Sequence, residues 1–108
     1  YDAVDVEIIM NDPASLSPTD TPLWDSIQRA VGKPFPGMSI TPQLVVGFTD
    51  ARVYRNMGSI AYGAGLFSPS VSPGDFSTRF HGNDERVDVE SLELSTNFWI
   101  DVAKDLLG

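Results

Sequence analysis

Residues 88–107 read DVESLELSTNFWIDVAKDLL, and this stretch predicts the closing helix of the fold. Asp88 is one of the residue types that cap the first backbone N–H groups of a helix. Beyond Asp88, one stripe at helical spacing consists of Leu92, Thr96, Trp99, Ala103 and Leu106. We therefore expect an amphipathic helix over residues 89–107, with Trp99 packed in the core.

A second helix is predicted near residue 22 by the same kind of signal. Thr21 can act as its cap, and Pro22 suits the first helical position because its missing N–H costs nothing there. Apolar residues then recur at helical spacing, at Leu23, Ile27, Ala30 and Val31. Gly32 and Pro34 mark the end of this helix.

Three short segments predict β-strands. In residues 1–10, acidic residues alternate with the apolar residues Val4, Val6 and Ile8. This period of two is typical of a half-buried strand. Residues 43–47 form a short apolar run that favours a buried strand, and residues 59–62 resemble another. Strands that alternate with helices predict an α/β fold, in which helices flank a partial sheet.

A third, shorter helix is expected between the last two of these strands. Thr49 or Asp50 can cap it, and Gly58 can stop it. The segment 63–80 is interrupted by glycine and proline and is predicted as a long loop.

Composition restricts the possible functions. The chain has 108 residues, of which 42% are hydrophobic and 20% charged, as in an ordinary globular domain. Its net charge of −8, with only 7 Lys and Arg, argues against nucleic acid as a partner. Because cysteine is absent, only histidine and carboxylates remain as strong metal ligands.

Two further expectations concern the protein's surroundings. No apolar run approaches the roughly 20 residues of a membrane span, and the start lacks the features of a signal peptide. We therefore expect no membrane partner and a cytoplasmic location. The chain opens in an alternating pattern without an initiator Met, which we interpret as a piece of a longer protein.

The stretch GFTDAR at residues 47–52 is the first candidate for chemistry. A predicted strand ends in glycine there, and Thr49 and Asp50 follow at a predicted helix start. Backbone N–H groups and a hydroxyl at such a position favour a carboxylate or an oxyanion. The alternative is structural: Thr49 and Asp50 would be plain capping residues, and Arg52 would form a surface salt bridge.

His81 is the only histidine, and it opens the stretch HGNDER at residues 81–86. A neutral imidazole can bind zinc through one nitrogen, while a carboxylate such as Glu85 orients the other. Gly82 would let the backbone approach a ligand closely. The alternative is a solvated histidine, followed by an acidic turn that caps the next helix.

Together these two stretches resemble motifs of the M20 metallopeptidase family, which includes carboxypeptidases, aminoacylases and amide-cleaving deacylases. Members commonly carry Gly-Gly-Thr-Asp-x-Arg, then His-Gly-x-(Asn/Asp)-Glu-Arg and a final amphipathic helix. The stretch YRNMG at residues 54–58 is similar to the family's continuation of the first motif. The resemblance implies that residues 11–108 are the C-terminal half of a zinc-peptidase-like catalytic domain. Residues 1–10 would be the end of an inserted lid or dimerisation domain, or the crossover strand out of it.

The resemblance also implies roles for single residues. His81 matches the family's last metal ligand, and Phe48 and Thr49 match a loop that lines the substrate's carboxylate or acyl pocket. Ser77 lies in a region that can face substrate, although the loop 68–80 is longer than expected. Asp50 and Arg52 match positions of structural support. Phe48 replaces the usual second glycine, which would restrict the backbone's approach to substrate.

The other ligands and the general base of that family have no counterpart in this chain. We therefore expect a fragment of a zinc-dependent hydrolase that cleaves a peptide or N-acyl amino acid amide. The parent would hold two zinc ions and form a possible homodimer, whereas the fragment alone would be inactive and metal-free. Three alternatives stay open. The enzyme could be an N-acyl amino acid deacylase instead of an exopeptidase, or a family member that has lost its metals. The chain could also be a non-catalytic acidic α/β interaction domain in which His81 is an ordinary residue.

Overall fold

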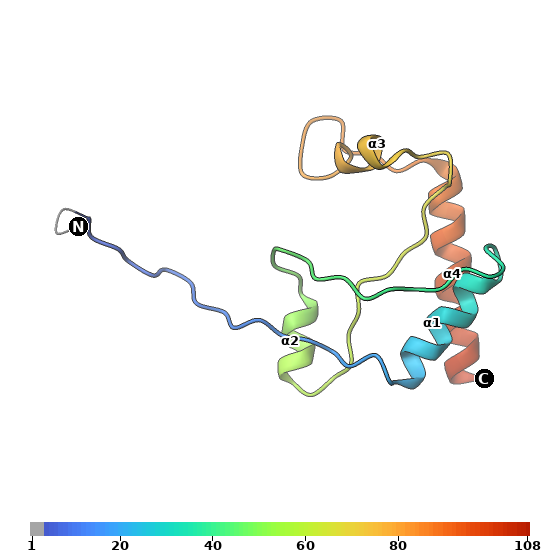
Figure 1. The fold of residues 1–108 in the computed structure, drawn as a ribbon, viewed down its shortest axis with the longest axis horizontal. Coiled ribbons are helices and arrows are strands. Elements are labelled where there is room, and N and C mark those ends of the chain that lie inside the picture. Colours follow the sequence, from blue (N-terminus) through green and yellow to red (C-terminus); the bar gives the residue numbers. More distant parts are fainter. Residues whose placement is uncertain (1–3) are drawn as a thin grey trace.

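The computed structural model describes residues 4–108, and this part of the chain contains four helices. They are α1 (Pro22–Gly32), α2 (Ala51–Asn56), α3 (Pro73–Ser77) and α4 (Val89–Leu107). Figure 1 shows α1 and α4 side by side, with α2 and α3 set apart from them and the N-terminal segment extending away. Among the described helices, only α1 and α4 pack against each other.

The predicted α/β class is wrong, because no residue between 4 and 108 lies in a β-strand. The predicted strands at 43–47 and 59–62 and the described part of 1–10 run as irregular or extended chain; residues 1–3 lie outside the described part. An alternating or apolar pattern specifies which faces are buried, but a strand also needs a neighbour for its N–H and C=O groups. Here the side chains have no covering layer: Val6 is 81% exposed and Val46 is fully exposed.

Helix α1 begins and ends as predicted. The hydroxyl of Thr21 accepts a hydrogen bond from the backbone N–H of Trp24 at 3.1 Å, and Pro22 occupies the first turn. The predicted apolar face is confirmed as well, since Ile27, Ala30 and Val31 are buried. The predicted position of helix α2 is confirmed, since Asp50 precedes its first residue and Gly58 follows its last turn with a left-handed φ of +88°, but the side chain of Asp50 makes no capping hydrogen bond.

The bounds of α4 are confirmed, but its predicted stripe is wrong. The buried residues are Ser91, Phe98 and Val102, whereas Trp99 is 43% exposed. Each buried residue stands one position before a residue of the predicted stripe. The buried face is therefore rotated by about 100° about the helix axis from the predicted face. Apolar side chains occupy two adjacent faces of α4, and α1 covers the face that carries Phe98 and Val102. No helix within residues 4–108 is long and apolar enough to cross a bilayer.

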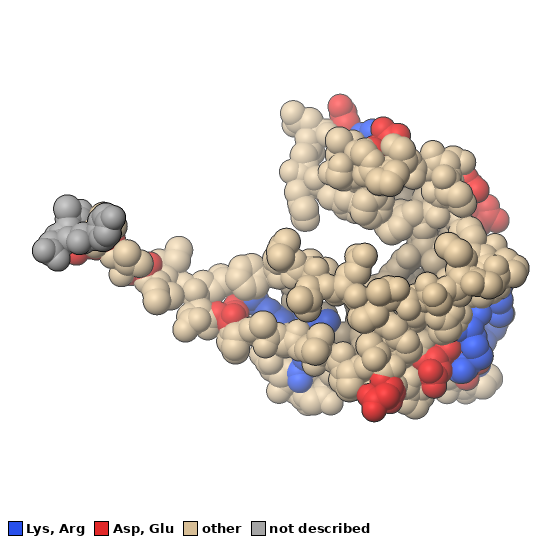
Figure 2. Space-filling view, viewed as in Figure 1, with Lys and Arg blue, Asp and Glu red and all other residues tan. Residues whose placement is uncertain are grey.

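The core is the contact between α1 and α4. Its buried apolar members are Ile27, Ala30, Val31, Phe98 and Val102, flanked by the partly buried Leu23, Ile40, Tyr62, Ala64 and Leu66. Two ion pairs border the contact, Arg29–Asp105 at 2.5 Å and Lys33–Asp101 at 2.7 Å. Figure 2 shows charged side chains gathered toward this end of the molecule, while much of the remaining visible face is uncharged.

The chain exposes far more surface than a self-contained domain of its mass. Its accessible area is 8759 Å², whereas a folded monomer of this size exposes roughly 5,900 Å². Its radius of gyration is 17.6 Å, against about 13 Å for a compact domain of this length. The α1–α4 contact therefore organises only part of the chain, and the extended segments bury little.

Helix α3 lies inside the segment predicted as a loop. The hydroxyl of Ser72 accepts a hydrogen bond from the backbone N–H of Asp75 at 3.1 Å, and Pro73 occupies the first turn. This is the arrangement that Thr21 and Pro22 form at α1. The signal was present in the sequence as Ser72-Pro73, but the many glycine and proline residues around it favoured a loop.

The offset of the buried face can be tested with two neighbouring aromatic residues. We expect Phe98→Ala to lower the free energy of unfolding by about 3–5 kcal/mol, because Phe98 is 2% exposed and leaves a cavity. Trp99→Ala should cost about 1 kcal/mol, because Trp99 is 43% exposed. Denaturant unfolding followed by the helical circular dichroism signal measures both. A larger loss for Trp99 than for Phe98 would restore the predicted stripe.

Candidate functional site

His81 lies in the connection between α3 and α4, in a backbone conformation unusual for a residue with a side chain. Its φ is +57°, and Asp84 in the same connection has a φ of +59°. His and Asp occupy this left-handed region more readily than most residues, but they need neighbours that hold them there. We call residues 80–87 the His81 loop.

Glu85 holds this loop through its backbone. Its Oε1 accepts a hydrogen bond from the backbone N–H of His81 at 2.8 Å. The expected contact of Glu85 was with the imidazole ring, and the ring makes no hydrogen bond to any described residue. The imidazole is exposed, and both of its nitrogens are free to meet a ligand from outside the chain.

A metal ion needs more ligands than this part of the chain brings together. Within residues 4–108 no group of three or more His, Asp or Glu side chains is close enough to hold one. Zinc in a catalytic site takes three protein ligands and keeps one open position. His81 can supply one nitrogen ligand, but the described residues do not form a complete metal site.

The segment 47–50 reaches α2 without using the polar side chains for capping. Asp50 stands at the helix start but makes no capping hydrogen bond with its side chain. The carbonyl of Thr49 accepts from the backbone N–H of Arg52 at 3.2 Å, while no described residue bonds its hydroxyl. Phe48 and Thr49 are both exposed. The hydroxyl of Thr49 is therefore available to a ligand.

Arg52 connects this segment to the N-terminal part of the chain. Its Nη1 lies 2.5 Å from Oδ2 of Asp12, and its guanidinium carbon lies 4.6 Å from the centre of the Phe48 ring. Both contacts are structural, and the ion pair is the kind that the alternative interpretation of Arg52 describes. An ion pair and a cation–π contact from one guanidinium fix Phe48 next to α2.

Arg55 is a residue that the sequence did not single out as important. Its Nε and Nη2 donate to the carbonyl of Ala61 at 3.0 Å and 2.7 Å, and its Nε also reaches the hydroxyl of Ser17 at 3.2 Å. Ser17 is 6% exposed and bonds both the N–H and the carbonyl of Ala61. Arg55 therefore joins α2 to two segments distant in sequence. Only its place in the YRNMG stretch hinted at such a role.

Ser77 ends α3, and its hydroxyl donates to the carbonyl of Gly74 at 2.8 Å. This contact lies within one helical turn. The structure gives no sign that Ser77 faces the segment 47–52.

The two predicted site segments are not brought together in the described part of the chain. Phe48, Thr49 and Arg52 line an open groove of about 1280 Å³, bounded by the segments 12–20 and 41–47. His81, Glu85 and Ser77 do not line this groove. Figure 1 shows α3 and the connection that follows it apart from α2. A single active site would need further residues to connect them.

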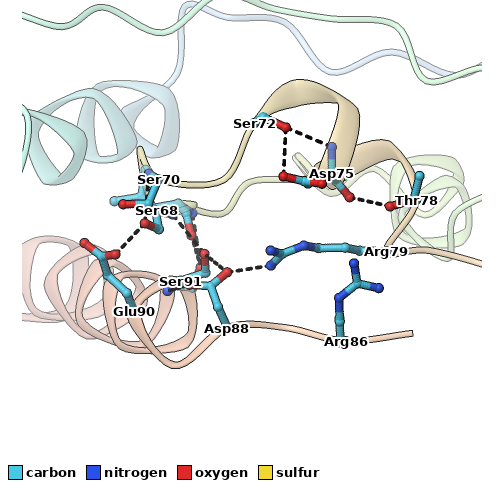
Figure 3. Close-up of polar contacts among 12 residues, drawn as sticks. Ser68, Ser70, Ser72, Asp75, Thr78, Arg79, Arg86, Asp88, Glu90 and Ser91 are labelled. Atoms are coloured by element: carbon cyan, nitrogen blue, oxygen red, sulfur yellow. Dashed lines mark hydrogen bonds and ion pairs between the residues drawn. The ribbon is translucent and has the colours of Figure 1, made fainter. Parts of the chain in front are cut away.

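The polar network at the start of α4 is shown in Figure 3. Asp88 accepts hydrogen bonds from the backbone N–H and the hydroxyl of Ser91, at 2.8 Å and 2.7 Å, and pairs with Nη1 of Arg79 at 2.7 Å. The backbone N–H of Ser68 donates to Ser91, and the hydroxyl of Ser68 donates to the carboxylate of Glu90. The hydrogen bonds from Ser91, and then the one from Arg79, lower the pKa of Asp88 to about 2.

Comparison with known proteins identifies the family. The chain matches peptidase family M20/M25/M40 over residues 2–105. It therefore belongs to this family, and the resemblance of its two motifs is confirmed. No solved structure matches the chain.

Three relatives share much of this chain but are far longer. It is 34% identical over 95 residues to the N-fatty-acyl-amino acid synthase/hydrolase PM20D1 of Xenopus tropicalis, which covers 87% of the chain and 18% of that protein. It is 33% identical over 87 residues to PM20D1.1 of Danio rerio, covering 80% and 16%. It is 26% identical over 106 residues to the probable carboxypeptidase S-like 2 of Dictyostelium discoideum, covering 96% and 20%. The chain thus spans a fifth or less of these relatives.

The lowered pKa of Asp88 predicts a pH dependence of stability. A carboxylate whose folded pKa lies below its unfolded value stabilises the fold above about pH 4, and loses that contribution as the pH falls toward 2. Asp88→Asn keeps an oxygen for capping but removes the charge. We expect the wild type to be more stable than this variant above pH 4, and the difference to shrink between pH 4 and pH 2. Denaturant unfolding at a series of pH values measures it.

Asp20→Asn is the matched control, because the side chain of Asp20 makes no hydrogen bond or ion pair with the described residues. A difference between wild type and Asp88→Asn that stays constant down to pH 2 would contradict the prediction.

Proposed function

We propose that this chain is part of a longer M20 hydrolase that cleaves the amide bond of an N-acyl amino acid, and that His81 supplies one of its metal ligands. The observation that carries this proposal is the 34% identity to an N-fatty-acyl-amino acid synthase/hydrolase over 87% of the chain. A peptide substrate is the second candidate, favoured by the 26% identity to a probable carboxypeptidase S-like protein.

The placement of His81 supports the ligand role. The imidazole is exposed and unbonded within the described chain, and Glu85 holds the backbone that carries it. A neutral imidazole nitrogen is a ligand that zinc accepts well. Because the described residues do not complete a metal site, the other ligands and the general base must come from the rest of the longer protein.

The placement of Thr49 supports a role in binding substrate. Its hydroxyl has no partner among the described residues, and it lines the groove with Phe48 and Arg52. A free hydroxyl can donate a hydrogen bond to a carboxylate or to an amide carbonyl. Arg52 is already paired with Asp12, so it contributes mainly by fixing this segment.

The expected cytoplasmic location and the expected homodimer stay predictions.

The ligand role of His81 is tested in the longer protein. We expect His81→Ala to lower the metal content by about one ion per subunit and to reduce kcat by roughly 100-fold or more, because a lost ligand displaces the metal. Metal analysis and amide hydrolysis measured on the same samples give both numbers. Unchanged metal content together with unchanged turnover would end the proposal for His81.

The substrate is tested by comparing N-acyl amino acids with dipeptides on the wild-type protein. The proposal expects the higher kcat/KM for N-acyl amino acids. A preference for dipeptides would instead select the second candidate.

A separate prediction concerns the 108-residue chain by itself. We expect it neither to hydrolyse these amides nor to retain zinc through dialysis, because one imidazole without nearby carboxylate ligands binds zinc weakly. Metal analysis after dialysis checks this. One tightly held zinc ion per chain would mean that two or more chains complete a site together.

A further inference from the structure

The His81 loop is closed at its base by a contact between its two ends. Arg79 stands immediately before the loop, and Asp88 stands immediately after it. Nη1 of Arg79 lies 2.7 Å from Oδ2 of Asp88. Figure 3 shows the Arg79 side chain reaching across to Asp88 at the start of α4. This ion pair therefore fixes the distance between the two ends of the loop.

The ion pair is more enclosed than the others in the described chain. The side chains of Arg79 and Asp88 are 16% and 29% exposed, compared with 59% and 36% for Arg29 and Asp105. Nε of Arg79 is buried and has no acceptor among the described residues. A guanidinium in this setting has few alternative positions, because moving away from Asp88 would leave more of its donors unpaired.

Both ends of the pair are attached to regular structure. On one side, the ring of Phe80 packs edge-on to that of Phe76 in α3 at 4.8 Å, and Phe76 packs on Phe67 at 4.5 Å. On the other side, Asp88 is bonded to Ser91 in the first turn of α4. The loop between them holds His81 and Asp84 in left-handed conformations, which require support from their surroundings.

We infer that Arg79 and Asp88 are positioning residues for His81: their ion pair holds the loop in the shape that presents the imidazole to the metal. This inference rests on the proposed ligand role of His81. Neither residue touches the imidazole or the reacting atoms. They act by closing the base of the loop, while Glu85 fixes the backbone of His81 from within it.

Asp88 has two roles, and the test must separate them. Asp88→Ala would remove both the ion pair and the cap of α4, so any effect could come from a frayed helix. Asp88→Asn keeps a side-chain oxygen that can accept from Ser91 but loses the charge that attracts Arg79. Arg79→Gln removes the same charge interaction from the other side and leaves the cap intact. Arg79→Lys restores the positive charge without the guanidinium fork.

The experiment uses the full-length protein with Arg79→Gln, Asp88→Asn, the double variant and Arg79→Lys, and with His81→Ala as the reference. We expect each single charge-removing variant to reduce metal retention during dialysis against a chelator, and kcat, by about 10–100-fold. KM should change by less than about threefold, since substrate contacts are untouched. The double variant should be no worse than either single variant, because both remove one interaction. Arg79→Lys should recover part of the loss.

A matched control is the pair Arg29–Asp105, which also joins an arginine to an aspartate on α4 but lies far from the loop. Arg29→Gln should leave metal retention and kcat unchanged. Hydrogen exchange of residues 80–87 provides a readout independent of metal and activity. Exchange there should accelerate at least about tenfold in Arg79→Gln and stay unchanged in Arg29→Gln.

The possible failures can be told apart. If His81→Ala leaves metal content and turnover unchanged, the proposed ligand role is wrong, whatever the loop does. If His81→Ala abolishes both but Arg79→Gln and Asp88→Asn have no effect on them, the positioning role is wrong and the ligand role stands. Unchanged exchange of residues 80–87 in Arg79→Gln overturns the positioning role by itself. The positioning role is also overturned if Arg79→Lys folds like the wild type but recovers none of the activity that Arg79→Gln loses.

Discussion

The contact between α1 and α4 is the one interaction on which the rest of this structure depends. It joins residues about seventy positions apart, and no other two described helices pack together. Its buried apolar residues are Ile27, Ala30, Val31, Phe98 and Val102, and on α1 the small side chains of Ser26 and Ala30, 0% and 3% exposed, allow the close approach. Burial of these few apolar residues is the main favourable term available to the described chain. Other segments are attached to this pair or to one another at single points.

Side-chain hydrogen bonds to the backbone provide most of these attachments. Segment 66–68 runs along α4, where Ser95 bonds both the N–H and the carbonyl of Leu66 at 3.1 Å and 2.7 Å, and Ser91 bonds the N–H of Ser68 at 2.8 Å. Ala61 is held in the same way: its carbonyl accepts from Arg55, and its N–H donates to the hydroxyl of Ser17. In this part of the chain the backbone groups that a strand would pair with a neighbour are satisfied by serine and arginine instead. Each of these attachments holds the backbone of a single residue, so the chain between the attached residues stays extended and exposed.

The sequence predicted local features well because their causes are local. A capping side chain and a proline at the first turn define the start of α1, and Asp88 defines the start of α4; both signals can be read from three or four adjacent residues. The strands failed for the opposite reason. The alternation at Val4 and Val6 describes a surface that could be half buried, but pairing depends on a neighbour that no local pattern specifies. The prediction for α4 chose the wrong one of two adjacent apolar faces, because contact with α1 decides which face is buried and the sequence of α4 alone does not.

The same distinction applies to the candidate site. Family motifs in the sequence pointed to His81 and Thr49, but Arg79, which pairs with Asp88, and Arg52, which pairs with Asp12, make contacts with residues that lie outside those motifs. The two segments also differ in what fixes them. The His81 loop is anchored within the chain, by Glu85 inside it and by the ends of α3 and α4 around it. Thr49 precedes a six-residue helix that packs against no other described helix, beside an open groove.

This difference determines how each segment would respond to the rest of a longer protein. The chain leaves 8759 Å² accessible, and its exposed apolar side chains include the fully exposed Val46 just before Thr49, so contacts with further residues would bury apolar surface around the segment 43–48 among others. Within the described chain, Arg52 alone ties the segment of Thr49 to Asp12 and Phe48, whereas the His81 loop is held both from within by Glu85 and at its base by Arg79 and Asp88. A metal ligand gains from such local rigidity because small displacements of a ligand weaken coordination. A segment with few internal contacts is instead positioned by the surface that it meets.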